Sequence, residues 1–229
     1  EASQVFFDLP PLAIKSILEM SNEHELAGRF EPRAAGPGLF KIDWALSAPI
    51  PWISSEVARA ATVHLGGPLD HVARSEQRPI RGEHSKRPFV VLSQPSLFDS
   101  TRAPSGRHVA WAYCHVPGGS TTDMTEAIED EIERYAPDFR SKVLARAKLN
   151  TRDLQSRNAN LVDGSIGGGE FRFWQMMVPR RTSPYLISRE RGFFSCSSST
   201  PPGPGIHGMC GFNAANLALR MTPRTPDTL

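Results

Sequence analysis

The sequence predicts an α+β protein with a mixed, largely antiparallel sheet and helices packed against it. Residues 38–46 alternate apolar and polar side chains, which is typical of a half-buried strand. Two further apolar segments, 88–95 and 107–117, are separated by a turn-rich linker, which favours an antiparallel pair. Apolar residues at helical spacing mark 122–136 as a helix. Because strands and helices alternate irregularly, a regular array of βαβ units is not expected.

The other elements follow from shorter patterns of the same kind. The helix at 122–136 is the most regular, since Met124, Ile128 and Ile132 form one stripe with acidic residues opposite. Residues 78–88 are polar and proline-flanked, so an exposed loop is expected there. The remaining expected elements are strands at 4–9, 61–67 and within 191–198, and helices at 12–20, 68–77, 137–149, 150–158 and 205–219, while 163–185 has no clear period.

Composition excludes several classes of function. The 229 residues carry a formal net charge of +2, and the one basic stretch, 140–157, has no interleaved aromatic residues, so no nucleic-acid partner is expected. No apolar run reaches the roughly 18 residues that span a bilayer. The three cysteines are far apart and odd in number, which implies no disulfide framework and a reducing compartment. The first residues do not resemble a signal peptide, so a cytoplasmic protein is expected.

A glycine-rich loop precedes the last expected helix. Gly203, Gly205 and Gly208 match the spacing G-x-G-x-x-G of dinucleotide-binding loops. The match fails as a first βα turn, because no second strand ending in an acidic residue follows and Pro204 removes a backbone N–H. A helix N-terminus with little side-chain cover still suits a flat, partly anionic group such as the edge of a flavin ring. The alternative is a glycine-rich turn that only packs the helix against a strand.

Longer stretches carry a more specific signal. The segment GFFSCSSSTPPGPGIHGMCGFNAANLAL closely resembles the C-terminal flavin-contacting segment of phytoene desaturase-like oxidoreductases, within the flavin amine oxidase superfamily. The stretches GLFKIDWALSAPIPW, APSGRHVAWAYCHVPGGSTTDMTEAIEDEIERYAPDFRSKVLAR and TRDLQSRNANLVDGSIGGG resemble the same family in its usual order. The resemblance covers most of residues 36–219, and QVFFDLPPLAIKSIL resembles the segment where such chains leave their nucleotide domain.

The resemblance implies a division of the chain and a cofactor, FAD. The implied parts are 1–35, a segment leaving the FAD-binding domain; 36–185, a substrate-binding domain; 186–220, a strand and helix completing an FAD-binding domain that is otherwise absent; and 221–229, a flexible tail. The diphosphate-binding loop belongs to an N-terminal half of the protein, which is the expected partner. Without that half, the chain is expected neither to bind FAD tightly nor to turn over substrate.

Carried over to this sequence, the family's flavin contacts fall on the C-terminal loop. The residues implied to line the isoalloxazine ring are Gly205, Ile206, His207, Gly208 and Met209. Ser197 and Ser198 are implied to lie near the ribityl–diphosphate chain, although the family often has glycine and a small or acidic residue there. The backbone N–H groups of Gly208 and Met209 are the ones expected nearest the ring.

The implied reaction is that of a dehydrogenase, desaturase or isomerase on an apolar, isoprenoid or lipid-like small molecule. Trp111, Tyr113 and His115 alternate onto one face of the strand at 107–117. They either line a substrate cavity facing the flavin or pack the sheet against helices, and His115 is a candidate for proton transfer. An apolar substrate also allows peripheral membrane contact, and unpaired sheet edges allow an isolated fragment to dimerise.

Three other interpretations compete with this one. His207, Cys210 and Cys196 lack a fourth ligand, so no metal site is expected. A thiol hydrolase built on Cys210 and His207 is disfavoured, because nothing in the sequence orients the histidine. A non-catalytic binding or interaction module that keeps the shape of the substrate domain is the principal alternative, and the departure at Ser197 and Ser198 supports it.

Overall fold

The computed structural model describes residues 2–30, 36–167 and 183–221. The chain forms two compact units, one made of residues 1–35 and 166–229 and the other of residues 36–165. The second unit starts close to the expected start of the substrate-binding domain, but it ends before residue 185, where that domain was expected to end. The functional roles given to these parts remain predictions.

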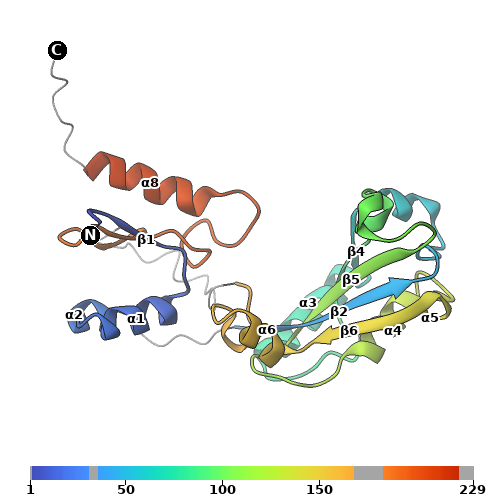
Figure 1. The fold of residues 1–229 in the computed structure, drawn as a ribbon. Helices are drawn as coiled ribbons and strands as arrows, with labels where there is room; N and C mark the ends of the chain where they lie inside the picture. The colour runs from blue at the N-terminus through green and yellow to red at the C-terminus, as the bar shows by residue number, and fades with distance from the viewer. Residues whose placement is uncertain (1, 31–35, 168–182, 222–229) are drawn as a thin grey trace, which may run out of the picture. The chain divides into compact units, whose positions relative to one another are not determined.

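The larger unit is built on a five-stranded sheet whose hydrogen-bonded neighbours are all antiparallel (Figure 1). Its strand order is β3-β4-β5-β2-β6. The strands are β2 (Gly38–Leu46), β3 (Thr62–Leu65), β4 (Val90–Ser93), β5 (His108–Val116) and β6 (Val143–Leu149). The expected antiparallel pairing of the segments around β4 and β5 is therefore confirmed, and the α+β fold class with it.

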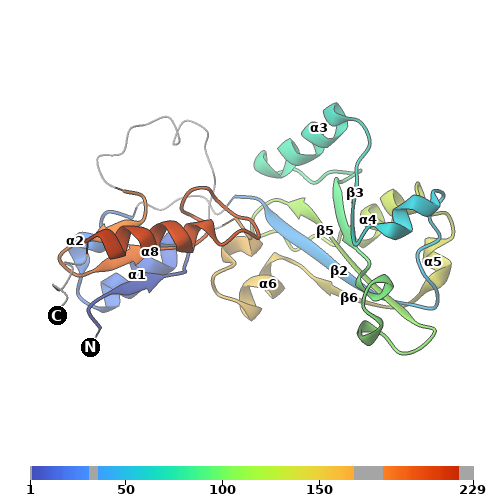
Figure 2. The same ribbon diagram turned by 90° about the horizontal axis from the view of Figure 1, so that it is seen from above.

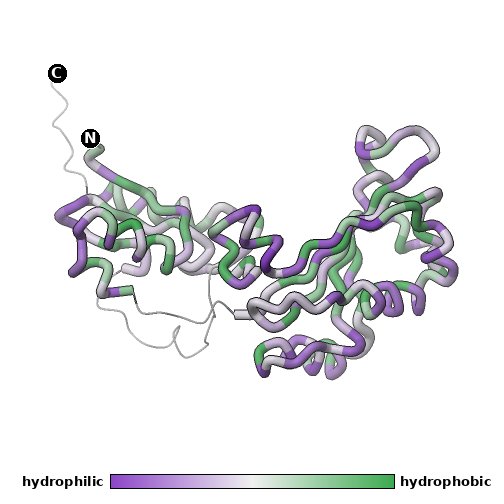
Figure 3. Tube along the Cα trace, turned by 60° about the horizontal axis from the view of Figure 1, so that its bottom comes forward, coloured by the Kyte–Doolittle hydropathy of each residue, from purple (hydrophilic) through white to green (hydrophobic). Residues whose placement is uncertain are grey.

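One face of this sheet forms the core of the unit. Hydrophobic and hydrophilic residues follow one another along its strands (Figure 3), and the hydrophobic set turns inward. Helix α4 (Thr125–Glu133) covers this face and buries Ile128 and Ile132 completely. Trp44 of β2 packs edge-on against Phe139, with ring centroids 5.3 Å apart. The alternation read from the sequence therefore places the core correctly.

The prediction of a helix at 137–149 is wrong for most of its length. Only Phe139–Lys142 are helical (α5), and the chain then continues as the edge strand β6. Asp138, with φ of 65°, adopts a left-handed conformation that begins this short turn. Strand β6 pairs with β2 and leaves most of its side chains exposed, so pairing with a free sheet edge overrides the helix-favouring composition.

The remaining helices of this unit are short or amphipathic. Helix α3 (Leu69–Ile80) extends past the expected end at residue 77, into the segment expected to be a loop. Its last turn includes Pro79. Figure 2 shows α3 apart from α4. Helix α6 (Thr151–Arg157) begins at a capping box formed by Asn150 and Asp153. Single 3₁₀ turns lie at Ser55–Arg59, Pro95–Leu97, Ser100–Arg102 and Val162–Gly164.

The smaller unit joins both ends of the chain. Strands β1 (Val5–Phe7) and β8 (Phe193–Ser195) are parallel, and β7 (Leu186–Ser188) pairs antiparallel with β8. Helices α1 (Pro11–Met20) and α8 (Met209–Met221) lie on opposite sides of these strands (Figure 1), and α2 (His24–Ala27) follows α1. The core of the smaller unit is formed by Phe7, Ile14, Leu18, Leu26 and Ala27.

The last helix begins four positions later than the sequence predicts, at Met209 rather than at Gly205. Gly208 has φ of +64°, a left-handed conformation that cannot continue an α-helix and that glycine adopts without strain. The predicted flavin-lining residues 205–208 are therefore a loop that leads into the helix. Within the residues that the structure describes, no helix is both long and apolar enough to cross a membrane.

Candidate functional site

The loop between β8 and α8 is folded back on itself by hydrogen bonds. The Thr200 backbone N–H and hydroxyl both donate to the Ser197 carbonyl, at 2.9 and 2.7 Å. The Gly203 N–H donates to the Thr200 carbonyl at 2.9 Å. The buried thiol of Cys210, in the first turn of α8, lies 3.4 and 3.5 Å from the carbonyls of Thr200 and Gly203. These contacts fix the loop to the helix that it precedes.

The five residues predicted to line the flavin ring form one exposed surface at the N-terminus of α8. Gly205, Ile206, His207, Gly208 and Met209 are all exposed, and the Ile206 side chain is fully so. A Cβ added at Gly208 would meet no atom within 4 Å, so open space borders the backbone there. A flat group could approach this backbone without meeting a side chain at Gly208.

The N–H groups at the start of α8 differ in their partners. The Met209 N–H donates to Nδ1 of His207 at 3.0 Å, so the imidazole caps the helix as a serine or aspartate side chain often does. Within the described part of the chain, the N–H groups of Cys210 and Gly211 have no hydrogen-bond acceptor. The unsatisfied donors thus lie one and two residues beyond the Met209 N–H that was expected to face a flavin.

Ser197 and Ser198 lie at the other end of the loop, just after β8. Ser197 is buried, and its hydroxyl is 2.6 Å from that of Ser199. Ser198 is half-buried. The Ser197 hydroxyl is hydrogen-bonded within the loop, whereas residues 205–209, before and at the start of α8, are exposed to solvent.

A residue that the sequence did not single out ties this loop to the helix. The Tyr185 hydroxyl donates to the Pro201 carbonyl at 2.9 Å and accepts from the Asn213 side-chain amide of α8 at 3.0 Å. Tyr185 ends the segment 163–185, which shows no periodicity, so no sequence signal pointed to this role. Most of that segment lies outside the described residues, including Trp174, Met176 and Met177, for which the sequence leaves the same choice between lining a substrate cavity and packing the core.

The side chains weighed as metal ligands or as a nucleophile pair, His207, Cys196 and Cys210, lie close to this loop. Among the described residues, no group of three or more histidine, cysteine or acidic side chains could hold a metal ion. The Cys210 thiol faces carbonyl oxygens and the His207 ring faces the Met209 N–H, so the two do not form a hydrogen-bonded pair. Burial, with the nearby charge of Asp8, raises the pKa of the Cys196 thiol, which disfavours the reactive thiolate.

A second candidate surface is the face of the larger sheet opposite its core. Trp111, Tyr113 and His115 of β5 are all half-buried there, whereas Ala112 and Cys114, between them, are fully buried in the core. The rings of Trp111 and Tyr113 are stacked, with centroids 6.3 Å apart and planes at 9°. The Tyr113 and His115 rings are 6.0 Å apart at 72°. The three side chains form one aromatic row, which we call the β5 platform.

Charged residues border the β5 platform. The Lys41 ammonium lies 5.6 Å from the centroid of the Trp111 ring and forms an ion pair with Asp43. Nδ1 of His115 lies 2.6 Å from Oε2 of Glu76, on α3. Burial and then the charge of Glu76 raise the pKa of Tyr113, so its hydroxyl stays protonated at neutral pH. The sequence did not indicate Glu76, because it is a single carboxylate 39 residues from His115.

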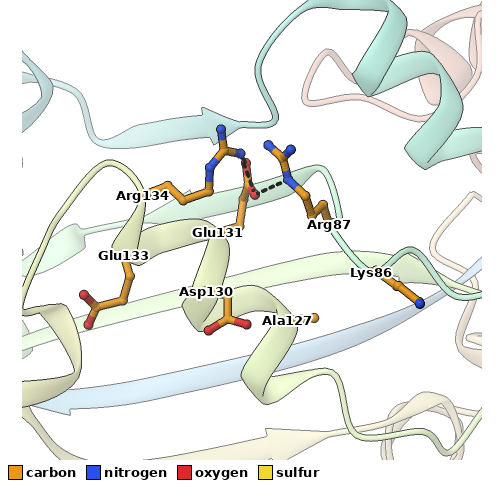
Figure 4. A pocket seen from close by; sticks show the side chains of 7 residues that line it. All are labelled: Lys86, Arg87, Ala127, Asp130, Glu131, Glu133 and Arg134. Carbon is orange, nitrogen blue, oxygen red and sulfur yellow. Dashed lines mark hydrogen bonds and ion pairs between the residues drawn. The ribbon is translucent and has the colours of Figure 1, made fainter.

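A surface pocket of about 470 Å³ lies along α4 (Figure 4) and is lined by Lys86, Arg87, Ala127, Asp130, Glu131, Glu133 and Arg134. The Glu131 carboxylate is buried and lies 2.9 and 3.0 Å from the Arg134 guanidinium and 3.5 Å from that of Arg87. Asp130 binds Arg140 at 2.6 Å. Because these carboxylates and guanidinium groups pair with one another, the pocket is lined by an ion-pair network and offers no unpaired carboxylate at Glu131 or Asp130.

Comparison with known proteins gives a partial match. No protein-family model matches the chain. The chain is 33% identical over 152 residues to the pyridine nucleotide-disulfide oxidoreductase domain-containing protein 2 of Rattus norvegicus and, equally, to that of Mus musculus. The match covers 61% of this chain and 26% of each relative, so the chain spans about a quarter of their length.

Among solved structures, the chain is similar to an oxidoreductase from Methanosarcina mazei, with a TM-score of 0.49 and 12% sequence identity. That match covers 97% of this chain and 43% of the other. The 33% identity over 152 residues shows that part of this chain is distantly homologous to a portion of the pyridine nucleotide-disulfide oxidoreductase domain-containing proteins.

Proposed function

We propose that this chain supplies the substrate-binding domain and the flavin-contacting loop of an FAD-dependent oxidoreductase. The reaction is a dehydrogenation or desaturation of an apolar, isoprenoid or lipid-like substrate. One observation carries the proposal: the N-terminus of α8, at the end of the loop that follows β8, offers open backbone at Gly208 and unpaired N–H groups at Cys210 and Gly211. The homology to oxidoreductase domain-containing proteins supports the same class of function.

The residues present fit a flavin at this helix end. Gly208 presents no side chain to a flat ring, whereas the His207 ring lies against Gly205, and the helix N-terminus favours electron-rich atoms placed against it. Bound FAD would supply the capacity to accept a hydride equivalent. The helix N–H groups would stabilise the negative charge that then develops. Ile206 and Met209 would add apolar contact, and the Met209 N–H would stay on His207.

The β5 platform supports the substrate half of the proposal. Stacked Trp111 and Tyr113 rings bind flat or chain-like apolar groups by dispersion and by excluding water. Lys41 and Asp43 neutralise each other at the edge of the platform, so they do not oppose an uncharged ligand. The role of the platform is to hold the substrate in one orientation, which is a major part of catalysis at an unactivated C–H bond.

The remaining part of the flavin site would come from elsewhere in the protein. The relatives are about four times as long as their matched part, which leaves room for a diphosphate-binding half. Strand β1 is at one edge of the small sheet and has β8 as its single neighbour among the described strands. We propose that the N-terminal half pairs along this edge, and that in an isolated chain the same edge favours dimers.

The proposal is tested by flavin content. The polypeptide that contains this chain together with its N-terminal half should purify with about one FAD per chain, released and quantified after denaturation. Gly208→Ala should lower the FAD affinity at least about tenfold, since a methyl group would enter the open space at the ring. Gly106→Ala is the matched control, because Gly106 also has a positive φ (71°) and nothing within 4 Å of an added Cβ.

The two variants share backbone strain but not location, so equal FAD affinities would overturn the assignment of the α8 N-terminus. A complete polypeptide that takes up no FAD would overturn the proposed function. It would favour a non-catalytic interaction module, for which the engagement of the Ser197 hydroxyl with Ser199 is the supporting observation.

A further inference from the structure

We propose that Glu76 and His115 form a general-base pair at the His115 end of the β5 platform. His115 Nε2 accepts a proton from an apolar ligand lying on Trp111 and Tyr113, and Glu76 is a positioning residue that acts through His115. This inference rests on the proposed function, which puts an apolar substrate on this face of the sheet.

The hydrogen bond between the two side chains sets the tautomer of the imidazole. Nδ1 of His115 and Oε2 of Glu76 are 2.6 Å apart, and a carboxylate can only accept, so the proton lies on Nδ1. The Nε2 lone pair of the neutral ring is then available, and within the described part of the chain no residue hydrogen-bonds Nε2. The side chains are 29% and 33% exposed, so a ligand can reach the ring.

Glu76 is held toward β5 by the packing of α3. The hydroxyl of Ser75, the preceding residue, accepts a hydrogen bond of 2.8 Å from the Phe89 N–H at the start of β4. The backbone at Gly66 lies close to Phe89 and to Val72 of α3, since a Cβ there would come within 3.0 Å of both side chains. The helix is therefore anchored in the turn that precedes Glu76, the residue that reaches His115.

The other ionisable side chains around the β5 platform do not compete with His115 as a proton acceptor. The Tyr113 ring stands beside the imidazole at 6.0 Å, and its raised pKa keeps the hydroxyl protonated. On β2, Leu39 is opposite His115 and Lys41 is opposite Tyr113, with Lys41 already paired to Asp43. Glu76 is thus the carboxylate that hydrogen-bonds the imidazole ring. A general base oriented by a carboxylate is a recurrent catalytic arrangement.

The pair completes the proton balance of a desaturation. A desaturation removes two hydrogens: bound FAD would supply the acceptor of the hydride equivalent, and the other hydrogen leaves its carbon as a proton. The electron pair of the second C–H bond becomes the new π bond, and its proton goes to Nε2 of His115. The charge that develops on the imidazolium is stabilised by the Glu76 carboxylate.

General-base competence can be measured on the chain itself, without flavin, using 5-nitrobenzisoxazole. This flat apolar molecule loses the proton on carbon 3, the C–H electrons form the nitrile, and the N–O bond breaks to release a coloured phenolate. His115→Ala should lower kcat/KM at least about tenfold. Glu76→Gln should lower kcat by a similar factor and leave KM unchanged, because Glu76 hydrogen-bonds His115, whereas the ligand lies on the rings of Trp111 and Tyr113.

Glu83→Gln is the matched control, since Glu83 is an exposed carboxylate just after α3 that pairs with Arg78. It should leave both constants unchanged. A His115→Ala chain that is as active as wild type would overturn the proposal, as would a Glu76→Gln chain that changes KM and not kcat.

A spectroscopic measurement separates positioning from a merely structural effect. In ¹⁵N-histidine-labelled chain, at a pH where the imidazole is neutral, His115 should show the shift pattern of a ring protonated at Nδ1. Glu76→Gln should convert it to a mixture of both tautomers, and an unchanged pattern would overturn the role of Glu76. Neither measurement needs FAD, so failure of this pair and failure of flavin binding in the complete polypeptide are separate results.

Discussion

At the scale of single residues, the C-terminal loop depends on one glycine conformation. Gly208 has φ of +64°, whereas Gly211, three residues on, lies in the first turn of α8 with an ordinary φ. Neither position would place an added Cβ within 4 Å of another atom, so substitutions at the two sites differ by backbone conformation alone.

We therefore expect Gly208→Ala to lower the free energy of unfolding by about 1–2 kcal/mol, the cost of a left-handed alanine. Gly211→Ala should raise it by about 0.5–1 kcal/mol, because alanine loses less entropy than glycine in a helix. Urea unfolding of the two variants beside wild type measures both effects. Changes of the same sign would show that the helix does not begin after Gly208.

Cys114 gives a second test at this scale. Burial, and then the charge of Glu76, raise the pKa of its thiol to about 12. Because the thiolate is the reactive form, Cys114 should not react with 5,5′-dithiobis(2-nitrobenzoate) at pH 8 until the chain unfolds in urea. Half-buried Cys196 serves as the internal comparison. Rapid labelling of Cys114 in the native chain would contradict its place in the core.

At the scale of elements, helix α4 carries two buried glutamates with opposite electrostatics. Burial opposes ionisation of Glu129, but hydrogen bonds from Arg146 and from Nε1 of Trp44 outweigh it and lower its pKa. Burial dominates at Glu131 and raises its pKa, with Arg87 offsetting only part of the effect. The first carboxylate thus stabilises the fold when ionised, and the second destabilises it.

At neutral pH, Glu129→Gln should lower the free energy of unfolding by about 1–3 kcal/mol, the value of charge-assisted hydrogen bonds. Glu131→Gln should leave it unchanged or raise it. An acid with a lowered folded pKa loses its contribution as pH falls through that pKa, so the deficit of Glu129→Gln should shrink below pH 4.5, the ordinary glutamate value. Urea titrations at neutral and acidic pH measure this, and equal effects of the two variants would contradict it.

The elements also show what sequence patterns can and cannot predict. The alternation in β2 and β5 was sufficient to place the core, because period-2 burial follows directly from strand geometry. Strand β6 was mistaken for a helix because its side chains are mostly exposed and its stability comes from backbone pairing with β2, which leaves no local trace. The same limit hid Glu76, whose partner His115 is brought to it only by the tertiary fold.

At the scale of the whole molecule, the unit of residues 36–165 has its own hydrophobic core, and its first and last residues lie close together. The Gly119 N–H donates to the Asp163 carbonyl at 3.1 Å, and Gly38 would clash with that carbonyl if it carried a Cβ. The chain therefore enters and leaves this unit at neighbouring points, which is typical of a domain that can fold alone.

We expect a fragment of residues 36–165 to unfold cooperatively in urea and to give a dispersed amide NMR spectrum. It should keep the nitrobenzisoxazole activity proposed for His115, since Glu76 and the β5 platform lie within it. Leu92→Ala, which removes a fully buried side chain, should destabilise it by about 2–5 kcal/mol and serves as the check on cooperativity. A collapsed spectrum would show that the unit depends on the rest of the chain.

The parallel pairing of β1 with β8 has a consequence for biosynthesis. Val5–Phe7 can find their neighbour only when Phe193–Ser195 have left the ribosome, long after the five-stranded sheet is complete. During that interval Phe7, buried in the finished protein, lacks its partner strand β8. The segment Val5–Phe7 thus needs protection, by a chaperone or by other parts of the polypeptide, until translation of Phe193–Ser195 allows the small sheet to form.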